Sequence, residues 1–413
     1  MIVLNKPIKN LTFEEIAKFC EEKIIEGIQI EYKKEFPAKG LAKQITAFSN
    51  TRGGIIIIGV KENEDSGVPE LWDGIQNEGK LIERVHQYAF NVEPPPSYEV
   101  SVTNEVNGKV FLLIRIFEGN ETPYFVQNNS NIWIRSGNIS QPISNASPEK
   151  LKSLFAKRDQ AEIAREVNLN TADNTCDALI SREQIKTQTQ PIITSDEISA
   201  NKSMREFPYL KIIFQPFFPD VSFKKPSELK SSIQHIHVNS KYQSEFPNYN
   251  QETIQYGIAS INYLDTSRRY SCEQIYGNGL IFFEKNFPNT EKKQFHISTV
   301  GNFLYLMLQS AKSVYNYLRF QGTIMGYILI SKIGDLEMQP ITLRQSPPSF
   351  IEPHEPLFGA YSWSVETDTN KLSCETELDK FFINTMNEIL VSLNFPAGTE
   401  DFFQIFLKEV GWK

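Results

Sequence analysis

Two acidic residues near the start of the chain have a spacing that can bring their carboxylates to one divalent cation. Glu26 and Glu31 are five residues apart, and Glu31 lies in the alternating apolar and polar segment 28–33. On one continuous strand, an odd spacing places two side chains on opposite faces. The carboxylates therefore converge only if the chain turns between them, and Gly27 permits such a turn because it has no Cβ atom.

Cations and a further acidic loop follow these carboxylates. Six basic side chains fall within 29 residues, and these are Lys33, Lys34, Lys39, Lys43, Arg52 and Lys61. The loop at 59–65 follows the apolar run 55–58 and contributes Glu62 and Asp65. Carboxylates at neighbouring strand ends can bind Mg²⁺ or Mn²⁺, an ion that activates water and stabilises charge on a phosphodiester. The neighbouring cations would then hold a nucleic-acid backbone.

The same residues also have an ordinary structural interpretation. Glu26 can simply end a helix, and Glu31 can pair with Lys33 on a solvated strand face. The segment 54–61 does not fit a Walker A phosphate loop, because no Ser or Thr follows its lysine and its four isoleucines indicate a strand. The residues alone therefore leave catalysis and surface pairing both open.

Apolar periodicity predicts the elements that must position these side chains. A capping box begins a helix after Thr12, and the alternating segment predicts a strand at 28–33. The β-branched run 55–58 predicts a strand that is covered on both faces. Further helices are expected at 39–50, 80–90 and 148–157, and hairpins at 98–117 and 124–135.

The middle of the chain loses this periodicity. Between 159 and 205, Asn, Thr, Gln and Asp dominate, which predicts a polar linker with one short helix near 160–167. We therefore expect a first domain at 1–158 and a second α+β domain at 206–413. In the second domain we expect strands at 209–214, 255–263, 279–283 and 326–330, and helices at 301–320, 376–393 and 399–410.

Composition limits the classes of function. The 413 residues carry 42 Lys and Arg against 50 Asp and Glu, a net charge of −8, which excludes a basic domain that coats nucleic acid non-specifically. No apolar run is long enough to cross a membrane, and the first residues lack the order of a signal peptide, so we expect a cytoplasmic protein. The four cysteines are far apart and form no Cys/His cluster, so we expect no structural zinc.

Three ordered motifs of the first domain resemble those of a known family. The segment IEGIQIEYK at 25–33 resembles the motif E-S-x-x-x-E-F-K, and ITAFSNTRGGIIIIGV at 45–60 resembles A-F-A-N-T-x-G-G-x-L-x-I-G-V. The segments IWIRSG at 132–137 and ASPEKL at 146–151 resemble the closing Y-x-R-x-G-S and A-S-x-E-E-I-x-x-L motifs. Over residues 10–157 the chain thus resembles the Schlafen AlbA-like domain, also described as a divergent AAA-type ATP-binding domain.

The resemblance implies an α+β fold with a mixed sheet in the first domain, and a nucleic-acid function. Schlafen proteins include metal-dependent endoribonucleases that cut tRNA and other structured RNA with three acidic residues. Two of these positions fall on Glu26 and Glu31. The third follows the G-V pair, where this chain has Lys61 and then Glu62, so we take Glu62 as the third ligand and Asp65 as its alternative. The nucleases resemble two fused copies that clasp RNA, so a single copy implies a homodimer.

We therefore predict a metal-dependent endoribonuclease that acts on tRNA or other structured RNA. Glu26, Glu31 and Glu62 are the predicted catalytic residues and the predicted ligands of Mg²⁺ or Mn²⁺. The predicted nucleic-acid-binding residues are Lys33, Lys43, Arg52 and Lys61. A toxic effector in phage defence is one role that such an enzyme would fit. The alternatives are a non-catalytic nucleic-acid-binding regulator and a nucleotide-binding sensor or scaffold.

Overall fold

The strand that carries four isoleucines is buried on both faces, as its composition predicts. In the computed structural model, all four isoleucines of β2 (Gly54–Ile58) are fully buried. The strand belongs to a four-stranded sheet with the order β1-β2-β9-β7. β1 (Ile30–Lys33) pairs with β2 in parallel, whereas β9 (Leu112–Ile116) pairs antiparallel with both β2 and β7 (Tyr98–Val102). This mixed sheet and its helices confirm the α+β class.

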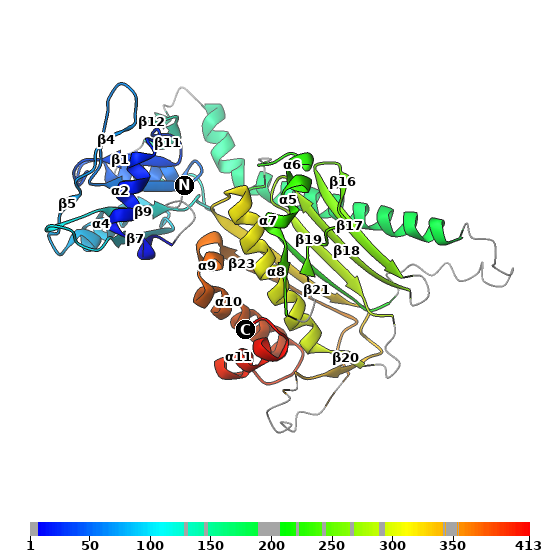
Figure 1. The fold of residues 1–413 in the computed structure, drawn as a ribbon. Helices are drawn as coiled ribbons and strands as arrows, with labels where there is room; N and C mark the ends of the chain where they lie inside the picture. Colours follow the sequence, from blue (N-terminus) through cyan, green and yellow to red (C-terminus); the bar gives the residue numbers. More distant parts are fainter. Residues whose placement is uncertain are drawn as a thin grey trace. The chain divides into compact units, whose positions relative to one another are not determined.

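The chain divides into two compact units. The first comprises Met1–Ile163 with Gln321–Thr323, and the second comprises Ala164–Phe320 with Ile324–Lys413. Figure 1 shows the helices and strands of each. The structure describes residues 7–127, 131–143, 148–188, 207–219, 223–241, 245–264, 268–288, 294–341, 343, 353 and 355–413. No helix among these residues is long and apolar enough to cross a membrane.

Helices cover both faces of the first sheet. α2 (Phe13–Glu21), which a capping box at Thr12 begins, packs on the face that carries Ile55 and Ile57. α3 (Leu41–Ser49) and α4 (Leu81–Ala89) pack on the opposite face, which carries the two alternate isoleucines. The pleat thus sends successive residues of β2 into two separate apolar clusters.

The short strands of the first unit pair differently from one sequence expectation. β10 (Phe125–Val126) pairs with β6 (Val92–Glu93), and β11 (Ile132–Ser136) pairs with β12 (Ile139–Ile143). The expected hairpin at 124–135 is therefore wrong. Gly137, which adopts a φ of +63°, allows the tight turn between β11 and β12 instead. The remaining elements are η1 (Ile8–Asn10), β3 (Lys61–Glu62) paired with β4 (Pro69–Leu71), and β5 (Ile75–Gln76) paired with β8 (Lys109–Val110).

A single long helix replaces much of the expected linker. α5 (Pro148–Gln188) continues through 159–188, a stretch that contains neither Gly nor Pro. Although most residues of this stretch are polar, Ala172, Cys176, Leu179 and Ile180 form a narrow apolar stripe that packs against the sheet of the second unit. The expected segment 189–205 lies outside the residues described.

The second unit is built on a seven-stranded sheet. Its order is β16-β17-β18-β19-β13-β21-β23. All seven expected elements of this domain are present, each with at least one boundary within two residues of its predicted position. The sheet strands β16, β18 and β23 were not expected. The strands are β13 (Tyr209–Pro216), β16 (Glu252–Ile254), β17 (Gly257–Leu264), β18 (Arg269–Tyr276), β19 (Ile281–Asn286), β21 (Thr323–Ser331) and β23 (Ala360–Asp368).

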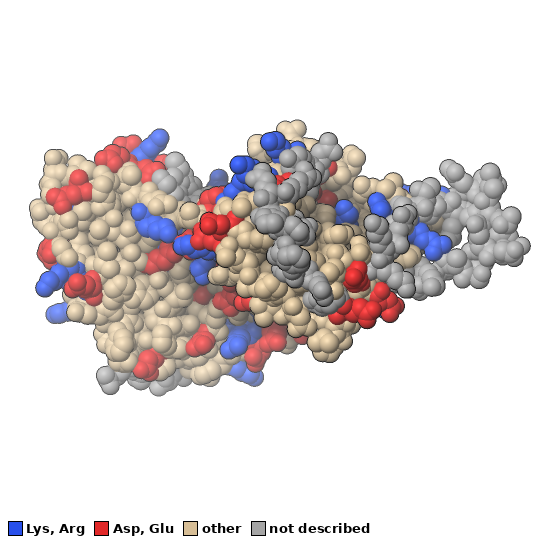
Figure 2. All heavy atoms as spheres, turned by 90° about the horizontal axis from the view of Figure 1, so that it is seen from below, with Lys and Arg blue, Asp and Glu red and all other residues tan. Residues whose placement is uncertain are grey.

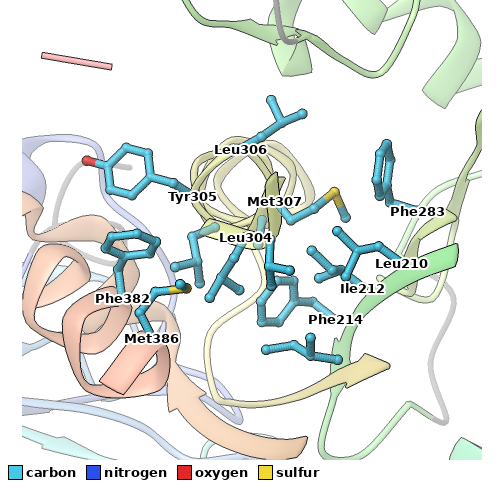
Figure 3. Close-up of a cluster of buried hydrophobic side chains, with 14 of the residues drawn as sticks. Leu210, Ile212, Phe214, Phe283, Leu304, Tyr305, Leu306, Met307, Phe382 and Met386 are labelled. Atoms are coloured by element: carbon cyan, nitrogen blue, oxygen red, sulfur yellow. The ribbon is translucent and has the colours of Figure 1, made fainter. Parts of the chain in front are cut away.

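Helices cover this sheet and complete its core. Figure 3 shows side chains of α8 (Ile297–Leu318) directed toward Leu210, Ile212 and Phe214 of β13, with Phe382 and Met386 of α10 (Glu375–Ser392) on the other side. α5 packs on the opposite sheet face. The remaining elements are α6 (Pro226–Ser231), α7 (Ile233–Ile236), α9 (Thr369–Ser373), α11 (Glu400–Glu409), β14 (Val238–Asn239), β15 (Glu245–Phe246), β20 (Gln294–His296) and β22 (Glu337–Gln339).

Candidate functional site

Three glutamates of the first unit meet around one ammonium group. Lys33 Nζ lies 2.8 Å from Glu31 Oε1, 3.6 Å from Glu62 Oε1 and 3.8 Å from Glu26 Oε1. Glu26 and Glu31 are buried, whereas the side chains of Glu62 and Lys33 are about one quarter exposed. We call these four residues the carboxylate cluster. It brings together the three predicted acidic residues, with a cation between them.

Each member of the carboxylate cluster is placed by a different local feature. Glu31 and Lys33 are two residues apart in β1, so their side chains share one face of the strand. Glu62 is in β3, which directly follows β2. Glu26 precedes β1, and its N–H donates to Gly67 O at 2.8 Å. Gly27 N–H donates to Ile30 O at 3.1 Å, so the expected turn is present. The φ angle of Gly27 is not in the left-handed region, so the turn does not depend on the special backbone freedom of glycine.

Glu31 is further fixed by residues from distant parts of the chain. The Arg135 guanidinium, whose side chain is fully buried, forms an ion pair with Glu31 Oε2 and donates to Gly27 O at 2.6 Å. Gln44 Nε2 of α3 donates to Glu31 Oε1 at 2.8 Å. Neither Arg135 nor Gln44 is among the predicted site residues, although Arg135 is the arginine of the Y-x-R-x-G motif.

Burial and the neighbouring carboxylates raise the pKa of Glu26 above its ordinary value. Burial, the hydrogen bond with Glu62 and repulsion from Glu31 raise the pKa of Glu26 to about 8, and the Tyr32 N–H at 2.8 Å offsets this only in part. Burial alone would lower the pKa of Lys33, but attraction to Glu31, Glu26 and Glu62 outweighs it and raises that pKa. Three carboxylates around a single ammonium thus carry surplus negative charge, which a proton on Glu26 relieves.

The other predicted nucleic-acid-binding residues lie outside the carboxylate cluster. Lys61 Nζ pairs with Glu70 Oε2 at 2.8 Å, and both side chains are about half exposed. Lys43 Nζ lies 4.2 Å from the centre of the Trp133 ring. Arg52 is exposed, and its carbonyl oxygen accepts a hydrogen bond from Gln29 Nε2 at 3.3 Å. The four predicted cations therefore form no single contact group.

Charges of both signs are interspersed over the surface in view. On the face in Figure 2, Lys and Arg side chains alternate with Asp and Glu side chains and do not gather into one basic area. A phosphate backbone that bound this face would meet individual cations next to carboxylates. Binding of that kind depends strongly on salt.

The donor atoms of the carboxylate cluster suit a hard divalent cation. Mg²⁺ and Mn²⁺ prefer carboxylate oxygens, and three carboxylates reach one point here. That point is held by Lys33 Nζ, and the described part of the chain contains no group of three or more His, Cys, Asp and Glu side chains already arranged to hold a metal. The residues therefore fit such an ion on condition that the lysine side chain moves aside. Asp65, the alternative third ligand, is exposed in the loop that follows β3.

Comparison with known families agrees with the motifs of the first unit. Residues 26–144 match the family model described as Schlafen, AlbA_2. The first unit contains a Schlafen AlbA_2 domain. All four residues of the carboxylate cluster, and Arg135, lie within the matched segment. The match indicates a nucleic-acid-binding or nuclease-like domain.

Two solved structures are also similar over part of the chain. The DIP2311 protein of Corynebacterium diphtheriae is 15% identical over 34% of this chain and 28% of its own, with a TM-score of 0.23. The N-terminal domain of a putative ATP-dependent DNA helicase RecG-related protein from Nitrosomonas europaea is 18% identical over 33% of this chain and 93% of its own, with a TM-score of 0.25. The chain thus spans less than a third of the DIP2311 protein. No curated protein matches the chain.

Proposed function

We propose that the Schlafen AlbA_2 domain makes this protein a metal-dependent endoribonuclease that acts on tRNA or other structured RNA. The observation that supports the proposal most is the approach of Glu26, Glu31 and Glu62 to within 3.8 Å of one point. These three residues would hold Mg²⁺ or Mn²⁺. When bound, such an ion lowers the pKa of water and stabilises negative charge on a phosphodiester.

The residues of the chain itself have distinct roles in this proposal. Arg135 and Gln44 hold Glu31 in place from two other elements. Lys33 leaves the centre of the carboxylate cluster and pairs with a phosphate oxygen of the substrate. The Glu26 carboxyl, whose pKa is about 8 without a metal, would lose its proton on becoming a ligand, so the affinity for the ion should rise with pH. Lys43, Arg52 and Lys61 bind the backbone on either side.

The test is cleavage of a tRNA transcript by the purified full-length protein with Mn²⁺. We expect Glu62→Gln to lower the rate about a hundredfold or more, since such groups contribute at least that factor. The side chain of Glu62 is partly exposed, so the substitution should leave the fold intact. Glu70→Gln, which changes an exposed glutamate that pairs with Lys61, is the matched control and should cut at the wild-type rate.

Equal cleavage by Glu62→Gln and the wild-type protein would refute the nuclease assignment. Circular dichroism of each variant shows whether a loss of activity reflects unfolding. The predicted homodimer is tested separately by light scattering of the same samples, with and without tRNA. A monomer that cuts tRNA would contradict the clasp formed by two copies but not the catalytic assignment.

One observation favours a second candidate, a nucleic-acid-binding regulator without catalysis. Lys33 occupies the point where the ion would bind, and Lys61 stands where the family motif has an acidic residue. In this case the protein would bind RNA or DNA with an affinity that falls steeply with salt, and no divalent metal would produce cleavage. Filter binding and cleavage assays on the same preparation separate the two candidates.

A further inference from the structure

A cavity in the second unit lies beside the start of α8. It has a volume of about 620 Å³, and its walls come from β17, β18, β19, β20 and the first turns of α8. Leu264 and Phe295 give part of the wall an apolar surface, whereas Arg269 and Lys285 contribute two cations. Sites for small molecules have volumes of about 300–1,000 Å³ and combine apolar walls with a few polar groups in this way.

The two cations lie on the sheet face that α8 covers. Ser271 is opposite Lys285 in the antiparallel pairing of β18 with β19. Arg269 is two residues before Ser271, so its side chain projects from the same face. Lys285 Nζ lies 4.8 Å from the centre of the Phe303 ring of α8. Both cations therefore border the same cavity between the sheet and the helix.

Among the residues that the structure describes, no carboxylate pairs with these two cations, Arg269 and Lys285. Burial and the nearby Arg269 lower the pKa of Lys285, and Glu273 on the same face offsets this only in part. Glu273 itself accepts hydrogen bonds from Asn248 N–H at 2.7 Å and Ser260 Oγ at 3.3 Å. An anion between the two cations would remove their mutual repulsion.

The start of α8 adds positive potential to the same cavity. Ser298 and Thr299, in the first turn of this 22-residue helix, border the cavity. The N-cap residue His296 makes no side-chain capping hydrogen bond, and the first turn contains no acidic residue. The first N–H groups of a helix need acceptors, and the helix dipole places a fraction of a positive charge there.

We propose that this cavity binds a small phosphorylated molecule of the size of a nucleotide. Its phosphate would contact Arg269, Lys285 and the first N–H groups of α8, and its less polar part would contact Leu264 and Phe295. The cavity favours a single nucleotide over a nucleic-acid strand, because a strand needs a groove that continues past each base. This site is separate from the carboxylate cluster and does not depend on the proposed nuclease activity.

Calorimetric titration of the full-length protein tests the proposal, with AMP, ATP, inorganic phosphate and adenosine as probes. We expect AMP or ATP to bind and adenosine not to bind. Lys285→Met and Arg269→Gln should each weaken binding about tenfold or more, because each removes a charge-assisted contact. Arg268→Gln is the matched control, since Arg268 is an exposed neighbour that is not among the residues bordering the cavity, and it should keep wild-type affinity.

A second measurement on the wild-type protein avoids any effect of substitution on folding. The nucleotide that binds should protect Lys285 from acetylation by acetic anhydride, with the exposed Lys241 as the internal reference. Failure of both nucleotides to bind, equal binding of adenosine and AMP, or equal acetylation of Lys285 with and without nucleotide would each overturn the proposal. Binding of a single-stranded oligonucleotide in place of the nucleotides would overturn it as well.

Discussion

We expect the substitution Glu26→Gln to stabilise the first unit at alkaline pH and to have little effect at acidic pH. In the wild-type protein, Glu26 lies between Glu62 and the backbone N–H of Tyr32, which donates to Glu26 Oε1 at 2.8 Å. A glutamine can keep an oxygen toward Tyr32 and direct its amide toward Glu62. It therefore imitates the protonated form of Glu26 at every pH.

The sign and size of the effect follow from the pKa of Glu26. The pKa rises from an ordinary 4.5 to about 8 on folding, so between these values the folded protein binds more protons than the unfolded chain. The free energy of unfolding of the first unit must then fall as the pH rises through this interval. The full shift corresponds to about 5 kcal/mol. Since Lys33 and Glu62 can rearrange when Glu26 ionises, we expect a measured difference of roughly 2–5 kcal/mol above pH 8.

Hydrogen exchange followed by mass spectrometry measures this stability within one unit of the full-length protein. Peptides that cover 26–33 report the opening free energy of β1, once the rates are corrected for the pH dependence of chemical exchange. The wild-type protein and Glu26→Gln should show the same opening free energy near pH 4, below the ordinary pKa, and diverge as the pH rises toward 9. EDTA is present throughout, so that no bound metal replaces the proton.

Parallel profiles for the two proteins across this pH range would refute the reasoning. They would mean that Glu26 ionises in the folded protein as it does in the unfolded chain, so the carboxylates would not form the cluster described above. Glu70→Gln serves as the control, because Glu70 is about half exposed and pairs with Lys61 outside the carboxylate cluster. Its profile should follow that of the wild-type protein.

Three further substitutions test other parts of the structure. Arg135→Met leaves Glu31 buried without its guanidinium partner and should destabilise the first unit by about 3–5 kcal/mol in the same exchange experiment, whereas the exposed Arg52→Met should change it by about 0.5 kcal/mol or less. Lys33→Met removes the ammonium that competes with a metal, so Mn²⁺ should raise the melting temperature of this variant more than that of the wild-type protein; equal shifts would contradict the competition. Asn174→Pro interrupts α5 at an exposed position and should cost about 3 kcal/mol or more, while Asn174→Ala should be tolerated; equal melting curves by circular dichroism would contradict a continuous helix.

The sequence predicted those parts of the site that depend on local order. Alternation at 28–33 and the run 55–58 were sufficient for β1 and β2, because a period of two and β-branched residues are properties of a strand alone. The same alternation places Glu31 and Lys33 on one face, and the structure places them 2.8 Å apart. The acidic position of the family motif falls on Lys61, and Glu62, which we take in its place, lies beside the same ammonium.

The sequence could not predict contacts between residues far apart in the chain. Arg135 is 104 residues from Glu31, and nothing in the local pattern of β11 distinguishes a buried ion pair from a surface arginine. Lys33 is predicted to bind phosphate as one of the cations near the carboxylates, and its pairing with Glu31 is the alternative interpretation. The local sequence does not show that Glu26 and Glu62 also approach its ammonium, because that depends on β3 and on the turn before β1. Their approach encloses Lys33 and makes its pairing with Glu31 part of a buried network.

Polar composition led to a different kind of error in α5. The stretch 159–188 was expected to be largely irregular because Asn, Thr and Asp favour turns. Thr171 and Thr175 instead turn their hydroxyl groups back to carbonyl oxygens four residues earlier in the helix, and the small residues Ala172 and Cys176 allow close packing on the sheet. The four small or apolar residues of this stripe, in a stretch of 30 mostly polar residues, are too few to produce a clear helical period in the sequence.

The unbroken course of α5 determines where the protein can be cut. Chains of two compact units often contain an extended joint that proteases attack, but here every residue of 159–188 belongs to a helix. We expect limited proteolysis to spare this stretch. A second unit expressed from residue 206 would lack the apolar stripe on α5 and expose the sheet face beneath it, so separate expression of the second unit should begin no later than Ala164.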